Sequence, residues 1–240
     1  AFSISDNAQQ RQRVEALVQT TNTPFLVSSG YVYRRDDEGN RLPGYYNASH
    51  LLKPDGRQDY YKRVLVPFFE YLPLAQQFPR VKHLFPGTLN YYAGKEPRLF
   101  KLNQQVRIIP IICYESIFSN SVGDFVDAGG NLIVNPVSDT WFGDSRGSAL
   151  HLSLGLLRSI EYRIPFIRVA NSGISAAITA SGDIIAGSET ELNTQALRIN
   201  RVSITQEHSP YSVIGDVFLW LASLAAILML GASWWQRATN

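Results

Sequence analysis

Cysteine is almost absent from this sequence of 240 residues, and its single instance, Cys113, excludes any disulfide bond within the chain. Histidine is also scarce, and the four histidines lack the spacing of metal ligands. They are His50, His83, His151 and His208. The 22 basic and 20 acidic residues are interspersed and form no basic stripe. The sequence therefore predicts neither a metal ion nor a nucleic-acid partner.

One long charge-free run stands near the end of the chain, at residues 217–235 (VFLWLASLAAILMLGASWW). Its 19 residues approach the roughly 20 that a helix needs to cross a bilayer. The alternative is a buried core helix, but soluble helices of this length carry a polar stripe. We predict one transmembrane helix at residues 212–236. The tail, residues 237–240, carries one arginine and no acid, which favours a cytoplasmic C-terminus and places residues 1–211 outside.

Hydrophobic periodicity divides the rest of the chain into helices and strands. Helices are predicted at residues 7–20, 119–128 and 148–162. Strands are predicted at residues 25–33, 45–52, 60–66, 106–112, 131–137, 166–170, 174–180, 184–186 and 195–204. Because strands alternate with helices in one part of the chain and form hairpins in another, we predict an α/β domain with a mixed sheet.

The chain is organised around the apolar run at residues 106–112, where Cys113 emerges from a strand buried on both faces. Ligands of open α/β sheets lie beyond the carboxyl ends of strands, so Cys113 is well placed as a nucleophile. A lone cysteine in such a run is otherwise a small buried hydrophobe. A nucleophilic thiol needs a base or a nearby cation, and no histidine lies close in sequence. Lys62 and Glu70 are candidates, although each read alone is typical of a solvated surface.

Four separated motifs carry a resemblance to a known family. They are residues 62–73 (KRVLVPFFEYLP), 112–115 (ICYE), 139–143 (DTWFG) and 158–173 (RSIEYRIPFIRVANSG). Their order resembles the catalytic domain of apolipoprotein N-acyltransferases, which are bacterial membrane enzymes of the nitrilase superfamily. The resemblance implies a nitrilase-like αββα sandwich, incomplete at its N-terminus and followed by one C-terminal transmembrane helix. It also implies the bacterial inner membrane, with the catalytic domain on the periplasmic side.

The resemblance also implies a role for each matching residue. Cys113 is expected to take a fatty acyl chain from a phospholipid as a thioester, and Lys62 to stabilise the oxyanion. Glu70, Tyr114 and Glu115 are expected to support this site. The acyl chain then passes to the α-amino group of a diacylglyceryl-cysteine lipoprotein. No cofactor is required by this chemistry.

Aromatic residues are the candidates for lipid contact. Trp141 and Phe142 are predicted to line an acyl groove, although buried core positions would suit them equally. The aromatic stretch at residues 72–94 is predicted to be a flap that meets the lipid bilayer, and an ordinary loop is its alternative. Asn47 is a further substrate-binding candidate. Its alternative is structural, because a buried asparagine most often satisfies backbone groups in a turn.

One element of the family pattern does not occur. The general-base glutamate of the family lies in a Pro-Glu motif upstream of the first helix, and no such motif is found here. We therefore expect this chain alone to be inactive or nearly so, because a general base contributes roughly a hundredfold or more. Two other functions stay open: a membrane-tethered amidase of the nitrilase type, and a catalytically dead membrane-anchored binding module. Rapid thiol alkylation at neutral pH would separate an activated Cys113 from a structural one.

Overall fold

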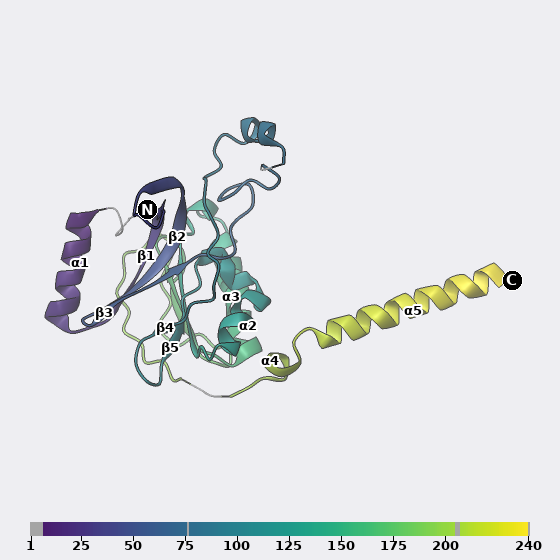
Figure 1. Ribbon diagram of the computed structural model, residues 1–240. Coiled ribbons are helices and arrows are strands. Elements are labelled where there is room, and N and C mark those ends of the chain that lie inside the picture. Colours follow the sequence, from purple (N-terminus) through teal and green to yellow (C-terminus); the bar gives the residue numbers. More distant parts are fainter. Residues whose placement is uncertain (1–6, 76, 205–206, 240) are drawn as a thin grey trace.

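The computed structural model describes residues 7–75, 77–204 and 207–239, and it shows a sandwich of two sheets between helices (Figure 1). Helix α1 (Ala8–Thr21) covers the outer face of the first sheet, and helices α2 (Ser119–Asp127) and α3 (Gly147–Tyr162) cover the second. This is the predicted nitrilase-like α/β sandwich.

The first sheet is an antiparallel meander of β1 (Phe25–Arg35), β2 (Arg41–Lys53) and β3 (Gly56–Tyr61). Helix α1 begins where the Asn7 side chain accepts a hydrogen bond from the Gln10 amide at 3.1 Å, which is an N-cap. Val18 of this helix packs on Leu52 of β2. The apolar side of α1 therefore closes the outer face of the sheet.

The second sheet has the order β4-β5-β6-β7-β8, with a parallel centre and antiparallel edges. Its strands are β4 (Phe100–Lys101), β5 (Arg107–Ile109), β6 (Leu132–Val137), β7 (Phe166–Ala170) and β8 (Ala176–Ile178). The central strands are mostly apolar on both faces because the first sheet covers one side and α2 and α3 cover the other. The carboxyl ends of β5 and β6 consequently meet at one edge.

The core lies between the sheets and beneath α2 and α3. It includes Leu51, Tyr60, Phe100, Ile109, Phe125, Ile133 and Phe166, each less than 2% exposed. The Gln58 side chain of β3 also joins the sheets directly, since it donates to the Lys101 carbonyl at 3.0 Å and accepts from the Lys101 amide at 2.8 Å. These contacts join β3 to β4, whose Lys101 pairs with Arg107 at the start of β5.

Four predicted strands differ from the structure. The strand predicted at 184–186 forms only an isolated bridge, between Ile184 and Ile178 of β8. The strand predicted at 60–66 ends at Tyr61, because the next residues turn into the sandwich. The strand before Cys113 covers only Arg107–Ile109, and Cys113 begins a short 3-10 helix, η2 (Cys113–Ile117). Residues 195–204 have the alternation of a strand but run as irregular chain. An alternating pattern produces a strand only where it packs on a neighbour, and Ile199 is 93% exposed.

Helix α5 (Val217–Thr239) projects away from the sandwich (Figure 1). Its segment Val217–Gln236 is, within the described ranges, the one helix long and apolar enough to cross a membrane, and it is entirely exposed. The short helix α4 (Pro210–Ile214) precedes it and ends at Gly215, whose φ of 55° suits glycine. The long helix therefore starts at Val217, inside the predicted segment 212–236.

Candidate active site

Cys113 lies four residues beyond the carboxyl end of the short β5 strand, at the first position of η2. Its φ is 49°, in the left-handed region that residues other than glycine seldom adopt, at a cost of about 1 kcal/mol or more. Two side chains hold its carbonyl oxygen: Ser116 Oγ donates to it at 3.0 Å and Asn135 Nδ2 at 3.3 Å. The nucleophile candidate is thus kept in a strained and fixed conformation, as is common at active sites.

Lys62 directly follows β3 and is buried, with 1% of its surface exposed. Its Nζ donates to both oxygens of Glu70, at 2.8 and 2.7 Å. Glu70, itself 4% exposed, also accepts from the Val66 amide at 2.7 Å and from Asn47 Nδ2 at 3.2 Å. The ammonium is therefore held in one place by a buried carboxylate. Because Asn47 donates to Glu70, it supports the Lys62–Glu70 ion pair.

Glu115 connects the Lys62 segment to the Cys113 turn. The carboxylate is completely buried and accepts four hydrogen bonds. The donors are Tyr60 Oη (2.7 Å), the Arg63 amide (2.7 Å), the Val64 amide (3.1 Å) and the Ile112 amide (2.7 Å). Three donors flank Lys62 in sequence, in β3 and just after it, and the fourth directly precedes Cys113, beyond the end of β5. Glu115 therefore sets the position of the cation relative to the thiol.

The charge of Lys62 reaches the Cys113 thiol. Burial raises the pKa of Cys113 above its usual value, and the Lys62 ammonium is the largest influence that lowers it. Hydrogen bonds from the Ser138 and Tyr114 amides lower the pKa further, whereas the Asp139 carboxylate raises it. Because the net direction is upward, the resting thiol is protonated at neutral pH. Attack on an acyl group then requires a proton acceptor as well as Lys62.

The predicted aromatic residues lie around this edge of the sheet. Tyr114 follows the thiol and packs edge-on to Phe118, with ring centroids 4.9 Å apart. Trp141 is 64% exposed, and its ring centroid lies 4.0 Å from that of Phe69. This contact connects Trp141 to the segment that carries Glu70. Phe142 is 39% exposed. Both residues belong to η3 (Thr140–Phe142), just beyond β6, and neither is a core residue.

The segment predicted as a flap extends outward from the sandwich (Figure 1). It contains η1 (Pro79–Leu84) and exposes several large apolar side chains. They are Leu74 (60% exposed), Phe78 (59%), Leu84 (74%) and Phe85 (40%). A soluble surface seldom gathers such residues without a partner.

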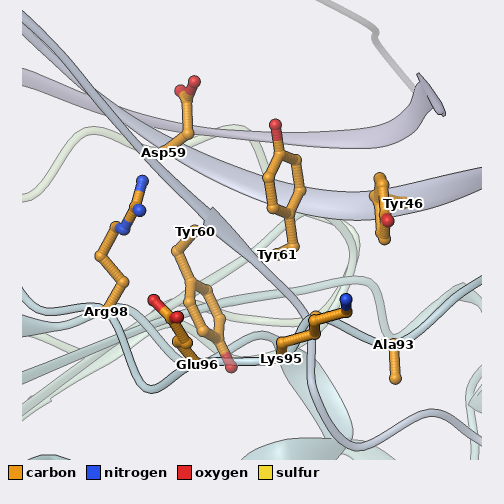
Figure 2. A pocket seen from close by; sticks show the side chains of 9 residues that line it. Tyr46, Asp59, Tyr60, Tyr61, Ala93, Lys95, Glu96 and Arg98 are labelled. Carbon is orange, nitrogen blue, oxygen red and sulfur yellow. The ribbon is translucent and has the colours of Figure 1, made fainter. Parts of the chain in front are cut away.

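A hollow of about 250 Å³ lies beside β3, the strand that leads to Lys62 (Figure 2). Tyr46 and Tyr61 line it from the first sheet, and Lys95, Glu96 and Arg98 line it from the following loop. This loop passes close to β3 at Gly94, where a Cβ atom would lie 2.2 Å from the Tyr61 carbonyl oxygen. Only glycine therefore lets the loop approach, and its amide donates to the Lys62 carbonyl at 2.8 Å.

Sequence reasoning missed a second buried polar cluster next to Cys113. It consists of Asn135, Asp139, Ser148, His151 and Arg168, each less than 9% exposed. A signal was present, because Asn135 and Arg168 interrupt apolar strands and a buried charge requires a partner. Asp139 belongs to the quoted motif at residues 139–143, but its partners Ser148, His151 and Arg168 are distant in sequence and meet it only in the folded chain.

Comparisons with known proteins agree with this geometry. Residues 5–206 match the carbon-nitrogen hydrolase family. Curated relatives named apolipoprotein N-acyltransferase include one from Geobacter metallireducens, 33% identical over 243 residues, covering 100% of this chain and 45% of the relative. Another, from Rickettsia prowazekii, is 29% identical, and the match covers 96% of this chain and 46% of the relative. The chain thus spans about half the length of these relatives. The predicted resemblance is confirmed.

Solved structures show the same fold. An amidase of the nitrilase superfamily from Nesterenkonia sp. AN1 superposes with a TM-score of 0.56 at 14% sequence identity. The superposition covers 79% of this chain and 65% of the amidase. At this identity the likeness concerns the arrangement of sheets and helices alone.

Proposed function

Because this chain belongs to the carbon-nitrogen hydrolase family, we propose that it is the catalytic part of a bacterial enzyme that transfers a fatty acyl chain from a phospholipid to a lipoprotein. The observation that carries the proposal is the buried Lys62–Glu70 pair, which Glu115 ties to the Cys113 turn. The relatives named apolipoprotein N-acyltransferase supply the substrate class. Residues 1–211 would form the catalytic domain.

In the first half of the proposed reaction, the Cys113 sulfur attacks the ester carbonyl of a phospholipid. The Lys62 ammonium stabilises the tetrahedral oxyanion, and the lysophospholipid oxygen leaves with a proton. In the second half, the α-amino group of a diacylglyceryl-cysteine attacks the thioester. The carbon–sulfur bond then breaks as the amide bond forms, and the proton lost by the amine restores the Cys113 thiol.

The proton acceptor is the part of this scheme that the described residues supply poorly. Both oxygens of Glu70 bind Lys62, and Glu115 accepts four hydrogen bonds. Neither carboxylate is free to take the proton of Cys113. We therefore infer that the complete enzyme provides another base, and that the described residues alone react slowly.

The proposed function also includes a membrane anchor and residues that contact lipid. Helix α5 would anchor the domain in the inner membrane through its apolar segment Val217–Gln236. Arg237, just after that segment, favours a cytoplasmic tail and a periplasmic catalytic domain. Trp141 and Phe142, exposed just beyond β6, would receive the acyl chain, and Tyr114 would contact it next to the thiol. Asn47 would act indirectly, through Glu70.

Incubation of the purified membrane protein with a phospholipid that carries a labelled acyl chain tests the proposed reaction. We expect the label to join Cys113 through a bond that neutral hydroxylamine cleaves, since the proposed intermediate is a thioester. Adding a diacylglyceryl-cysteine peptide should move the label to its α-amino group. Mass spectrometry of the protein and of the peptide measures both steps.

The matched control is Cys113→Ala, which should acquire no label. Label on the alanine variant, or release of free fatty acid with no transfer to the peptide, would contradict the acyltransferase. The second outcome would favour an amidase-like hydrolysis instead. A chain extended upstream should react faster than the chain of 240 residues, and efficient acylation of the shorter chain would reject the inferred need for another base.

The flap is proposed to enter the headgroup region through its exposed apolar side chains. A nitroxide attached at Leu84→Cys in a Cys113→Ala background, with the protein in vesicles, measures this. We expect higher accessibility to oxygen dissolved in the membrane than to a water-soluble nickel chelate. The control label at Asp55→Cys, in the exposed turn between β2 and β3, should show the reverse. Equal values at both positions would leave the flap an ordinary loop.

A further inference from the structure

A buried ion pair lies beyond the carboxyl end of β6, next to the Cys113 turn. Arg168 Nη2 donates to Asp139 Oδ2 at 2.5 Å, and the residues are 1% and 2% exposed. Ser148 Oγ donates to the same oxygen at 2.6 Å, and His151 Nδ1 lies 3.1 Å from Asp139 Oδ1. Three side chains from α3 and β7 thus fix one carboxylate.

This carboxylate is connected to the thiol through the backbone. Ser138 immediately precedes Asp139, and a hydrogen bond from its amide lowers the pKa of the Cys113 thiol. The charges of Asp139 and Arg168 also reach the sulfur, the first repelling a thiolate and the second attracting it. Asn135, the cross-strand neighbour of Arg168, donates to the Cys113 carbonyl. The ion pair and the nucleophile therefore form one contiguous unit.

Stability alone accounts poorly for this pair. Desolvating two charges offsets most of the attraction between them, so a buried ion pair adds little to folding. Arg168 Nη1 and His151 Nε2 also have no hydrogen-bond partner within the described part of the chain. The backbone nevertheless makes room for the carboxylate, because a Cβ at Gly173 would lie 2.1 Å from Asp139 Oδ2. Such an arrangement indicates a local role.

We propose that Asp139 and Arg168 are positioning residues for Cys113. Asp139 holds the Ser138 amide against the sulfur, and Arg168 neutralises Asp139 so that the carboxylate does not oppose formation of the thiolate. The inference rests on the proposed function only in taking Cys113 as the nucleophile.

Removing Arg168 leaves an uncompensated carboxylate beside the sulfur, and a nearby charge shifts a pKa by one unit or more. At a pH below the thiol pKa, the Arg168→Met variant should therefore react with iodoacetamide about tenfold more slowly than wild type, with its pH profile displaced upward. Asp139→Asn combined with Arg168→Met removes both charges and should recover part of the lost rate. Cys113 is the only cysteine, so alkylation reports on this thiol alone.

Arg158→Met is the matched control. Arg158 is also buried and ion-paired, to Glu161 at 2.7 Å, and it donates to the Ile117 carbonyl at the far end of η2. Its loss should lower the melting temperature without displacing the pH profile. An unchanged profile in Arg168→Met, an equal displacement in Arg158→Met, or no recovery in the double variant would each overturn the inference.

Arg168→Lys provides a second variant if Arg168→Met does not fold. It keeps the charge and loses the bond from Nε to the Ile174 carbonyl, so we expect its profile to stay near wild type. A displacement as large as that expected for methionine would reject the charge role. A wild-type thiol that reacts at no pH would instead reject Cys113 as the nucleophile, which separates failure of the proposed function from failure of this inference.

Discussion

The Lys62→Met variant is expected to form the Cys113 thioester about two to three orders of magnitude more slowly than wild type, because the oxyanion loses its charged donor. The loss of the ammonium also raises the pKa of Cys113 further, since Lys62 is the largest influence that lowers it. Initial rates of labelling by an acyl-labelled phospholipid measure the effect.

The same variant leaves the Glu70 carboxylate buried without its cation. An unpaired buried charge of this kind destabilises a protein by about 3–5 kcal/mol. The double variant Lys62→Met with Glu70→Gln should recover part of this stability and none of the activity, which separates the two effects. Lys53→Met removes the cation of the exposed pair with Asp55, 3.2 Å apart, and should change neither property by much. A Lys62→Met protein that labels at the wild-type rate would exclude Lys62 from the reaction.

The Glu115→Ala variant is expected to lose about 4 kcal/mol of unfolding free energy, because four donors, two of them in fully buried hydrogen bonds, lose their acceptor. For a chain of this size, that corresponds to a fall in melting temperature of roughly 10 °C. Thioester formation should also be lost, because the Glu115 carboxylate binds both the amides that follow Lys62 and the amide that precedes Cys113. Without it, the cation and the thiol lose this shared anchor. Thermal unfolding and labelling rates are the two measurements.

Two controls bracket this result. Tyr60→Phe removes one of the four donors and should cost about 1 kcal/mol. Asp124→Ala removes the half-exposed partner of the Arg63 side chain, 2.6 Å away, and should cost about 1 kcal/mol or less. A Glu115→Ala protein as stable as the Asp124→Ala protein would show that the buried carboxylate does not join the two sheets.

Much of the fold followed from local patterns. Helix α1 begins beside Asn7, the predicted helix start, and β7 covers the predicted residues 166–170. These elements have clear caps or continuous apolar runs, which depend on neighbours in sequence. The strand predicted at 195–204 failed for the opposite reason. Its alternation is local, but a strand also needs a sheet edge to pair with, and no local pattern specifies one.

The candidate site also combines residues that local sequence patterns predicted with residues whose role depends on tertiary contacts. Cys113 was predicted because it directly follows a buried run, and Lys62 and Glu70 were candidates near a strand end. The roles expected for Lys62, Glu70 and Glu115 rest on the resemblance to a known family. Read without that resemblance, Lys62 is typical of a solvated strand edge, yet it is 1% exposed. Its burial depends on Glu70, eight residues away across a turn. Arg168 was missed because its partner lies 29 residues away, in a different strand connection.

The main helices, the central strands of the second sheet, the apolar C-terminal helix and the position of one thiol just beyond an apolar run were determined by the sequence alone. Each depends on residues within a few positions of one another, where backbone geometry and hydrophobic periodicity act directly. Only the tertiary structure decided which charges meet. Buried carboxylates must find donors wherever the packed sheets bring them, and so the links from Glu115 to the Lys62 segment and from Asp139 to Arg168 exist only in the folded chain.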